Sequence, residues 1–139
     1  MDVVVVAGYG NRFYDYGSAQ GVAYPAADPN CISVGATYAS GNSQGHKYYD
    51  GQRNVTAVAY KTVTDCITPF SQRDAALTTV FAPGAPIGST FIHSDFSTLH
   101  GTNQAAAHVS GVAVLAQGRL LRGLHAATWR PDRPGAYWW

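Results

Sequence analysis

The amino-acid sequence predicts an α/β fold, in which a parallel β-sheet packs against a buried central helix. Three observations lead to this prediction. Val3–Ala7 is a continuous apolar run without alternation, which is typical of a strand buried on both faces. Cys31–Ala36 is a second short run of this kind. Ala105–Gln117 is rich in Ala and Val and apolar nearly all round, which indicates a helix in the centre of a layered domain.

The remaining elements follow from turn residues and apolar runs. Gly41–Gln52 is polar and is interpreted as a long loop, and Asn54–Ala59 after it as a third strand. Leu77–Ala82 is expected to form a fourth strand, which ends at Pro83-Gly84. Gly111 would allow the predicted helix to pack closely against its neighbours.

The composition limits the class of protein. The chain has 139 residues, enough for one domain with a modest core. Charged residues make up 12% and the net charge is +1, so neither a nucleic-acid partner nor an anionic membrane is indicated. Val3–Ala7 is too short for a signal peptide and follows an acidic residue. Ala105–Gln117 is too short to span a bilayer.

The character of the chain changes at Gly118. The net charge is −2 up to this residue and +3 beyond it, and all three tryptophans lie in the last part of the chain. We therefore expect one domain over residues 1–117 and an atypical Arg- and Trp-rich tail over residues 118–139. A shifted reading frame, a fusion scar, a disordered extension or a divergent tail would each explain this change.

The strongest functional signal is Gly101–Gly111, which reads GTNQAAAHVSG. This segment resembles the nucleophile motif of the subtilisin-like serine proteases (the subtilase or peptidase S8 family), Gly-Thr-Ser-x-Ala-x-Pro-His-Val-x-Gly. In that family the Ser opens a buried helix, whose N-terminus contributes positive potential where an oxyanion forms. In this chain Asn103 stands at the Ser position and Ala107 replaces the Pro.

Three further segments agree with the same family, in its order along the chain. Val3–Asn11 (VVVVAGYGN) resembles the strand that ends at the oxyanion-hole Asn. Tyr24–Ala36 (YPAADPNCISVGA) resembles the Tyr-Pro-Ala…Val-Gly-Ala segment, in which the bond that matches Tyr24-Pro25 is cis. Residues 67–71 (ITPFS) and 80–84 (VFAPG) resemble the Phe-Ser…Ala-Pro-Gly segment. The resemblance implies part of a three-layer subtilisin-like fold.

The resemblance also implies roles for individual residues. Asn11 would donate its side-chain amide to the tetrahedral oxyanion, and Asn103 would occupy the nucleophile position. An amide nitrogen has no lone pair available for attack, so Asn103 cannot replace a hydroxyl. Tyr9 stands where the family has a small residue and would crowd the primary specificity pocket.

The family's Asp and His segments precede the oxyanion strand, whereas only Met1 and Asp2 precede it in this sequence. We therefore expect the C-terminal portion of a subtilase catalytic domain, inactive by itself because the Asp, His and Ser of the triad are absent. The alternatives are a pseudoprotease that binds peptides and one half of a split enzyme, which Asn103 argues against. The substrate class would be a peptide or protein. The family is often secreted, but no signal peptide marks this chain.

Other reactive residues suggest little chemistry. Cys31 and Cys66 fit no metal or redox spacing, so two buried free thiols are favoured over a disulfide. His108 is expected to be a structural residue of the helix. No His pair has metal-ligand spacing on a helix, and His46, His93 and His100 are interpreted as surface or turn residues. No cofactor is expected, although carbonyls near Ala26–Cys31 occupy a stretch where relatives hold a weak cation.

Overall fold

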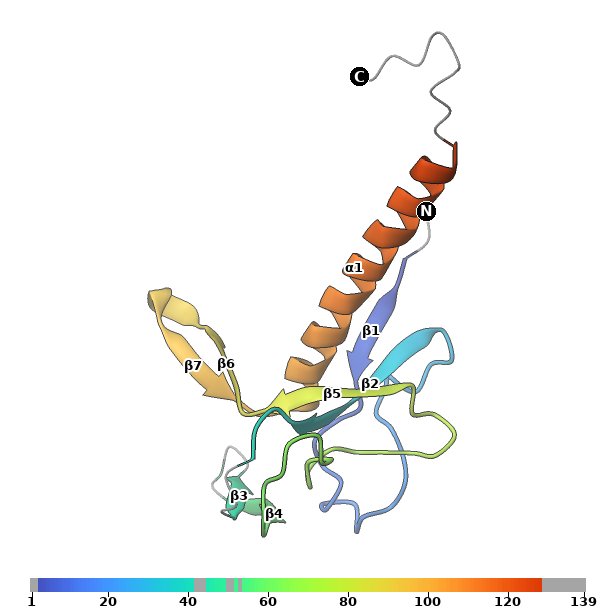
Figure 1. Ribbon diagram of the computed structural model, residues 1–139. Coiled ribbons are helices and arrows are strands. Elements are labelled where there is room, and N and C mark those ends of the chain that lie inside the picture. Colours follow the sequence, from blue (N-terminus) through green and yellow to red (C-terminus); the bar gives the residue numbers. More distant parts are fainter. Residues whose placement is uncertain (1–2, 42–44, 50–51, 53, 129–139) are drawn as a thin grey trace, which may run out of the picture.

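The computed structural model describes residues 3–41, 45–49, 52 and 54–128, and for residues 56 and 122–128 the backbone alone. A parallel sheet and one long helix form the body of the molecule, and two short hairpins extend from it (Figure 1). The elements are β1 (Val5–Gly8), β2 (Cys31–Tyr38), β3 (His46–Tyr49), β4 (Val55–Ala59), β5 (Val80–Ala85), β6 (Ile87–Thr90), the 3-10 helix η1 (Ile92–Ser94), β7 (Phe96–Leu99) and α1 (Thr102–Thr128).

The parallel sheet has the strand order β1-β2-β5, so β2 is the central strand. β1 pairs with β2 from Val5 opposite Cys31, and β2 pairs with β5 from Val34 opposite Val80. α1 contacts all three strands and covers one face of the sheet (Figure 1). The predicted α/β arrangement of a parallel sheet and a helix is therefore confirmed.

Small side chains set the distance between α1 and the sheet. Ala36 in β2, Ala85 in β5 and Ala105 in α1 are completely buried and belong to one apolar cluster. Gly84 in β5 also lies at this junction, because an added Cβ would come within 2.7 Å of the Ala36 Cβ and 3.3 Å of the Ala105 Cβ. Larger side chains here would force the helix away from the strands.

Two predictions of strand position are wrong, and in both cases the cause is a tertiary contact that the local sequence does not reveal. Gly41–Gln52 was interpreted as a loop, yet it contains β3, which forms an antiparallel pair with β4 and buries Tyr48 in the core. The predicted fourth strand, Leu77–Ala82, is displaced: β5 starts at Val80 and continues through Pro83-Gly84. Proline is tolerated because β5 lies at the edge of its sheet, where one side of the strand needs no N–H donors.

The predicted burial of Val3–Ala7 is also wrong. β1 forms within this run and is parallel, as expected, but Val3, Val4 and Val5 are 79%, 54% and 47% exposed. β1 is an edge strand, and in the described part of the chain nothing pairs with its outer side.

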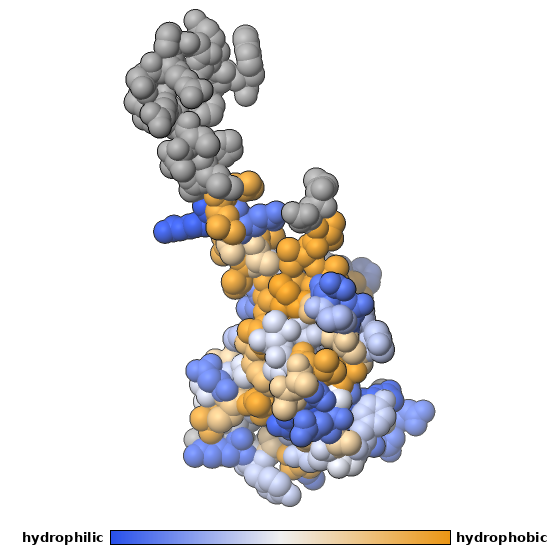
Figure 2. Space-filling model, turned by 90° about the vertical axis from the view of Figure 1, so that its right-hand side faces the viewer, coloured by the Kyte–Doolittle hydropathy of each residue, from blue (hydrophilic) through white to orange (hydrophobic). Residues whose placement is uncertain are grey.

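The same correction applies to Ala105–Gln117, which is helical but not buried along its length. Ala105 and Ala106 are buried, whereas Val112, Val114 and Leu115 are 64%, 68% and 75% exposed. Figure 1 shows α1 running past the end of the sheet, and Figure 2 shows apolar surface concentrated on this projecting part. The apolar pattern predicted the helix correctly but could not tell whether another layer covers it.

α1 continues through Gly118 to Thr128 without a break. Leu120 and Leu121 on this extension are 68% and 53% exposed, and the three tryptophans lie outside the described residues. The division into residues 1–117 and 118–139 remains a prediction. Within the described ranges, no helix combines the length and apolarity needed to cross a membrane. The Tyr24-Pro25 bond is cis, as the resemblance implied.

Candidate active site

The candidate site lies where the carboxyl end of β1 meets the N-terminus of α1. The backbone N–H of Tyr9 donates to the Val34 carbonyl at 2.9 Å, which extends the β1–β2 pairing by one residue. The next N–H, that of Gly10, donates instead to the Thr102 hydroxyl at 3.2 Å. Gly10 has a φ of +107°, and a Cβ there would collide with the Gln72 side chain, so this turn requires glycine.

Asn11 follows this turn and is fixed against the helix. Its side-chain Oδ1 accepts a hydrogen bond of 2.9 Å from the backbone N–H of Thr102, the first residue of α1. Since the oxygen of the amide is used, the Nδ2 group is left as a donor. Nδ2 lies 3.3 Å from the position that a Cβ on Gly101 would take, so glycine at this position keeps space open beside the donor.

Asn103 is the second residue of α1 and is exposed. The backbone N–H groups of the first turn point out of the helix, and this end of the helix dipole is positive. No acidic residue stands in the first turn to neutralise it. The structure thus brings Asn11 within hydrogen-bonding distance of the residue next to Asn103, although 91 positions separate Asn11 from Thr102.

Tyr9 is completely buried behind the site, where its ring meets Phe81 edge-on with the centroids 6.0 Å apart. Burial raises the pKa of its hydroxyl, and the nearby Thr78 and Thr79 offset only part of this effect. This bulky residue therefore packs into the interior beneath the site. Its predicted effect on a specificity pocket remains a prediction.

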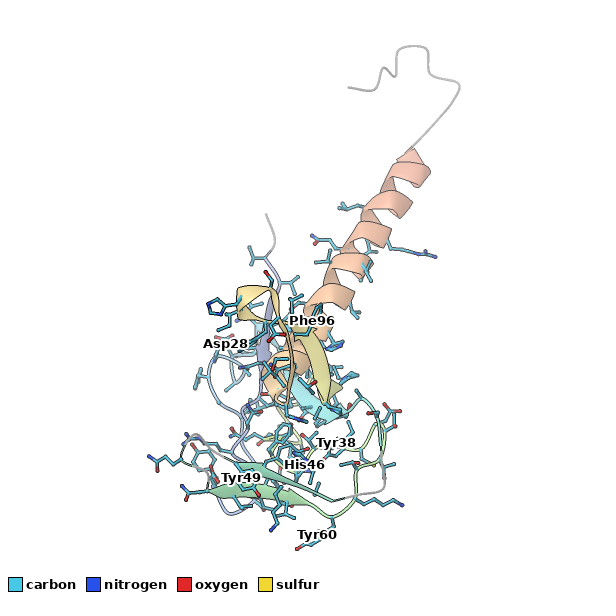
Figure 3. All side chains as sticks on the ribbon, turned by 90° about the vertical axis from the view of Figure 1, so that its left-hand side faces the viewer. Asp28, Tyr38, His46, Tyr49, Tyr60 and Phe96 are labelled. Atoms are coloured by element: carbon cyan, nitrogen blue, oxygen red, sulfur yellow. The ribbon has the colours of Figure 1, made fainter. Side chains whose placement is uncertain are left out.

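His46 and His100 are exposed, as the sequence suggested, but they contact each other and a neighbouring ring. Their rings stack 5.3 Å apart at 27°, and both pack against Tyr48. Figure 3 labels His46 on β3 and Tyr38, the last residue of β2. The Tyr48 hydroxyl donates a hydrogen bond of 2.9 Å to the Tyr38 hydroxyl. Partial desolvation beside these rings, and to a lesser extent the charge of His46, lowers the pKa of His100. This cluster joins β3 to the segment before α1, and no spacing in the sequence predicts it.

Neither His108 nor His93 forms a hydrogen bond with Asn103. His108 lies one turn further along α1, and its Nδ1 contacts the Gln104 carbonyl at 2.9 Å, in agreement with the structural role expected for it. His93 is exposed in a left-handed backbone conformation with a φ of 58°, as a turn residue would be.

The cysteines and the suggested cation stretch have other roles. Both cysteines are free thiols, but only Cys31 is buried and Cys66 is exposed, which corrects the prediction of two buried thiols. In the stretch near Ala26–Cys31, the Ala26 carbonyl accepts a hydrogen bond from the Ser33 hydroxyl and the Asp28 carbonyl accepts one from the Cys31 N–H. A carbonyl oxygen that accepts one hydrogen bond keeps a second lone pair, so the suggested weak cation site stays a prediction. Among the described residues, no three His, Cys or acidic side chains form a metal-binding group.

Comparison with known proteins agrees with this geometry. The sequence model of the subtilase family matches residues 1–130. M-protease of Shouchella clausii is 34% identical over 113 residues, which are 81% of this chain and 22% of that protein. Alkaline serine exoprotease A of Vibrio alginolyticus is 35% identical over 104 residues, 71% of this chain and 19% of that protein.

Among solved structures, the prenylagaramide maturation protease PagA aligns with a TM-score of 0.58 and 26% sequence identity. The alignment covers 87% of this chain and 34% of that protease. The chain therefore spans about a fifth of the length of the two relatives and a third of the solved structure. The match covers nearly the whole chain and includes the site between β1 and α1, and the chain belongs to the subtilase family.

Proposed function

We propose that this chain carries the oxyanion-stabilising side of a subtilase-type peptide site and that it does not itself cleave peptide bonds. The observation that supports the first part is the contact between Asn11 and the first residue of α1. The Thr102 N–H holds the Asn11 amide by its oxygen, so that the nitrogen is presented to the exterior. Asn11 Nδ2 and the positive end of α1 would together stabilise negative charge on the carbonyl oxygen of a bound peptide or protein substrate.

The second part of the proposal rests on Asn103. In the family motif this position holds the serine that attacks the substrate carbonyl. A carboxamide nitrogen shares its lone pair with the adjacent carbonyl, so Asn103 cannot form an acyl intermediate. Restoring a hydroxyl would not suffice in this chain, because none of the described histidines is hydrogen-bonded to residue 103 and able to accept its proton.

The test compares the chain with its Asn103→Ser variant. Both proteins are incubated with a fluorogenic peptide and with a serine-directed phosphonate, and their folding is verified by circular dichroism. We expect no turnover and no labelling in either, since loss of one triad group reduces turnover by roughly 10⁴–10⁶ and the remaining groups do not compensate. Turnover by the unaltered chain, or labelling of residue 103 in the variant with turnover above a heat-inactivated control, would refute the proposal.

A second candidate function is a pseudoprotease that binds an extended peptide. The outer edge of β1 is unpaired in the described residues, and a cavity of about 470 Å³ lies between β1 and α1. Edge strands bind peptides by continuing the main-chain hydrogen bonding of a sheet, and apolar recesses hold alternate side chains. Val5 and Val114 line the cavity from its two sides.

Fluorescence anisotropy of a labelled peptide with alternating Val and Thr tests this candidate. Val114→Glu places a charge in the cavity and should abolish saturable binding. Leu120 is also on α1 and is 68% exposed, as Val114 is, but it does not line the cavity. Leu120→Glu should therefore leave binding intact. Equal binding by both variants would exclude this mode. Binding with no turnover would favour the pseudoprotease over an inert piece of a protease.

A further inference from the structure

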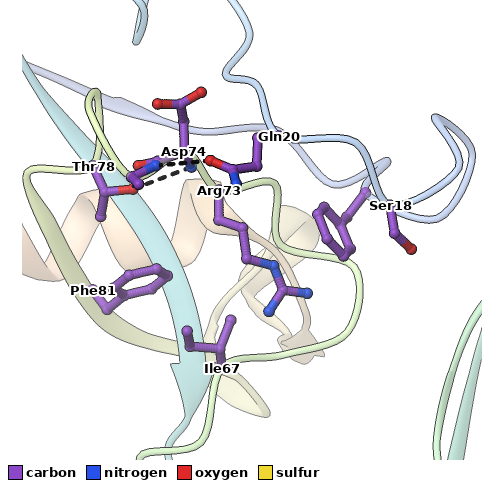
Figure 4. A pocket seen from close by; sticks show the side chains of 9 residues that line it. Ser18, Gln20, Ile67, Arg73, Asp74, Thr78 and Phe81 are labelled. Atoms are coloured by element: carbon purple, nitrogen blue, oxygen red, sulfur yellow. Dashed lines mark hydrogen bonds between the residues drawn. The ribbon is translucent and has the colours of Figure 1, made fainter.

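A second cavity, none of whose lining residues belongs to the candidate active site, contains an arginine that forms no ion pair with any acidic group among the described residues. The cavity has a volume of about 630 Å³, within the usual range for small-molecule sites, and lies between the segment after β1 and the segment before β5. Its apolar wall comes from Phe13, Ile67 and Phe81 (Figure 4). Arg73 extends into this cavity, and its guanidinium group lies on the side of Ile67 (Figure 4).

Arg73 is held in place by its backbone and by an aromatic ring. Its carbonyl accepts a hydrogen bond of 3.0 Å from the Gly21 N–H, where the two residues form an isolated antiparallel bridge. The guanidinium carbon lies 3.9 Å from the centre of the Phe13 ring, which is a cation–π contact. The position of the charged group is therefore defined before any ligand arrives, and this lowers the entropy lost on binding.

At least one donor of Arg73 has no acceptor in the described part of the chain. Its Nε is buried and has no hydrogen-bond partner among the described residues, and Arg73 takes part in no ion pair there. A buried donor without an acceptor is unfavourable, and such groups are rare in folded proteins. Burial also lowers the pKa of the guanidinium below its usual value, as expected for a charge removed from water without a counter-ion.

Asp74 is the nearest acidic residue in the sequence, but it is committed elsewhere. Its Oδ1 accepts hydrogen bonds from the backbone N–H groups of Ala76 and Leu77 at 2.8 and 3.2 Å. Figure 4 shows its carboxylate pointing away from the guanidinium group of Arg73. Asp74 nevertheless lines the cavity and would repel a ligand with a large negative charge.

These features select the chemistry of the ligand. The planar guanidinium group matches a carboxylate, with two parallel N–H···O bonds. The aromatic and aliphatic wall requires an apolar body next to that carboxylate. A phosphate with two negative charges fits less well, because one arginine faces it and Asp74 adds repulsion. We propose that this cavity binds a carboxylate attached to an apolar group, with Arg73 as the anchoring residue.

Two sources could supply this chemistry, namely a small free acid or the C-terminal carboxylate of a peptide that ends in an apolar residue. Calorimetric titrations of the full chain separate them. The first probe is 3-phenylpropionate, with 3-phenylpropionamide as the neutral match. The second is acetyl-Gly-Gly-Phe with a free carboxylate, with its C-terminal amide as the match. Tighter binding of the free acid identifies the first source, and tighter binding of the peptide acid identifies the second.

Three variants assign the binding to Arg73. Arg73→Gln should weaken binding of the carboxylate by about tenfold or more, the usual effect of losing hydrogen bonds to a charged group, and should leave the amide unaffected. Arg73→Lys should retain part of the affinity, because it keeps the charge but not the planar fork. Arg119→Gln removes the same charge from α1 and should have no effect.

If circular dichroism shows that Arg73→Gln does not fold, Ile67→Glu provides the test, because a glutamate in the wall would pair with Arg73 and displace the probe. The proposal is overturned if wild-type protein binds the amides as tightly as the carboxylates. It is also overturned if neither acid binds with a dissociation constant below about 10 mM, a free energy close to that of non-specific contact. Unchanged carboxylate binding by a folded Arg73→Gln or Ile67→Glu variant would overturn it as well.

Discussion

The side-chain oxygen of Asn11 accepts a hydrogen bond from the backbone N–H of Thr102 and so connects the segment after β1 to the start of α1. This N–H is one of the four at a helix N-terminus that no residue within the helix can satisfy. Helices usually meet this need with a capping side chain just before their first turn. In this chain Gly101 has no side chain to offer, and the partner comes from a different part of the fold.

Replacing Asn11 tests how much its hydrogen bond to the start of α1 contributes to stability. Asn11→Ala should reduce the free energy of unfolding by about 0.5–2 kcal/mol, as for loss of a helix cap, whereas Asn11→Asp keeps the accepting oxygen and should be close to wild type. Urea unfolding measures both. Asn30→Ala, which removes a local contact with Asp28 on the surface, is the control and should change stability by less than about 0.5 kcal/mol. Equal losses in both Asn11 variants would contradict this account.

Gly84 should not tolerate a methyl group. A Cβ there would lie 2.7 Å from both the Ala36 Cβ and the Gly101 carbonyl oxygen, so β5, β2 and the start of α1 would have to separate. We expect Gly84→Ala to lower the free energy of unfolding by about 1–3 kcal/mol. In Gly88→Ala the nearest atom, the Thr98 hydroxyl oxygen, is 3.9 Å away, and this variant should be neutral. Similar stabilities for the two variants would show that the junction can expand.

The stability of the chain should fall on mild acidification because of His100. Its pKa is lowered in the folded state, first by partial desolvation against the neighbouring rings and then by the charge of His46. In the unfolded chain His100 has its ordinary pKa of 6.5, so below this pH the unfolded state binds a proton more readily than the folded state does. The free energy of unfolding therefore decreases as the pH falls from 6.5 toward the lowered pKa of the folded state. Above pH 6.5 this contribution is complete.

Thermal unfolding between pH 7.5 and 5.5 measures this dependence. His100→Gln should flatten the pH dependence in that interval, whereas the exposed control His93→Gln should leave it as in wild type. A His100→Gln variant with an unaltered pH profile would mean that other groups cause the loss.

The exposed apolar side of α1 should make the isolated chain self-associate. Leu115 is 75% exposed and lies near Val112 and Val114, and contiguous apolar surface of this kind favours association. Sedimentation velocity over a range of concentrations should show that Leu115→Glu reduces association without changing stability by more than about 0.5 kcal/mol. Tyr60→Glu alters an equally prominent residue, 90% exposed beyond β4, and should associate as wild type does. If Tyr60→Glu reduced association and Leu115→Glu did not, the self-associating surface would lie outside α1.

The parts of the fold that the sequence predicted are those determined by neighbouring residues. β2 was predicted from its run of apolar residues, and α1 from its Ala-rich, nearly all-apolar composition. The exposure of β1 and α1 depends on what lies beside them, and the passage of β5 through Pro83 depends on its position at the sheet edge. Neither property is encoded locally.

In the candidate site too, some residues could be predicted from the sequence and others depend on tertiary contacts. Asn11 and Asn103 were found through motifs that resemble a known family, because spacing alone would not connect residues so far apart. The stacked pair of His46 and His100 was missed, since it forms only when the β3–β4 hairpin folds back on the segment before α1. The sequence did not indicate Arg73 either, because the absence of a counter-ion among the described residues depends on its three-dimensional surroundings.

The central position of β2 has a consequence for the order in which the protein opens. In the described sheet, β2 is the one strand with partners on both sides, and Val34 and Ala36 within it are completely sealed from solvent. Its amides should therefore exchange with deuterium only through global unfolding, while those of β1 exchange through local opening of the edge. Along α1, protection should decline from Ala105 toward Leu120 and Leu121, which are 68% and 53% exposed. A gradient of exchange rates would thus run outward from β2.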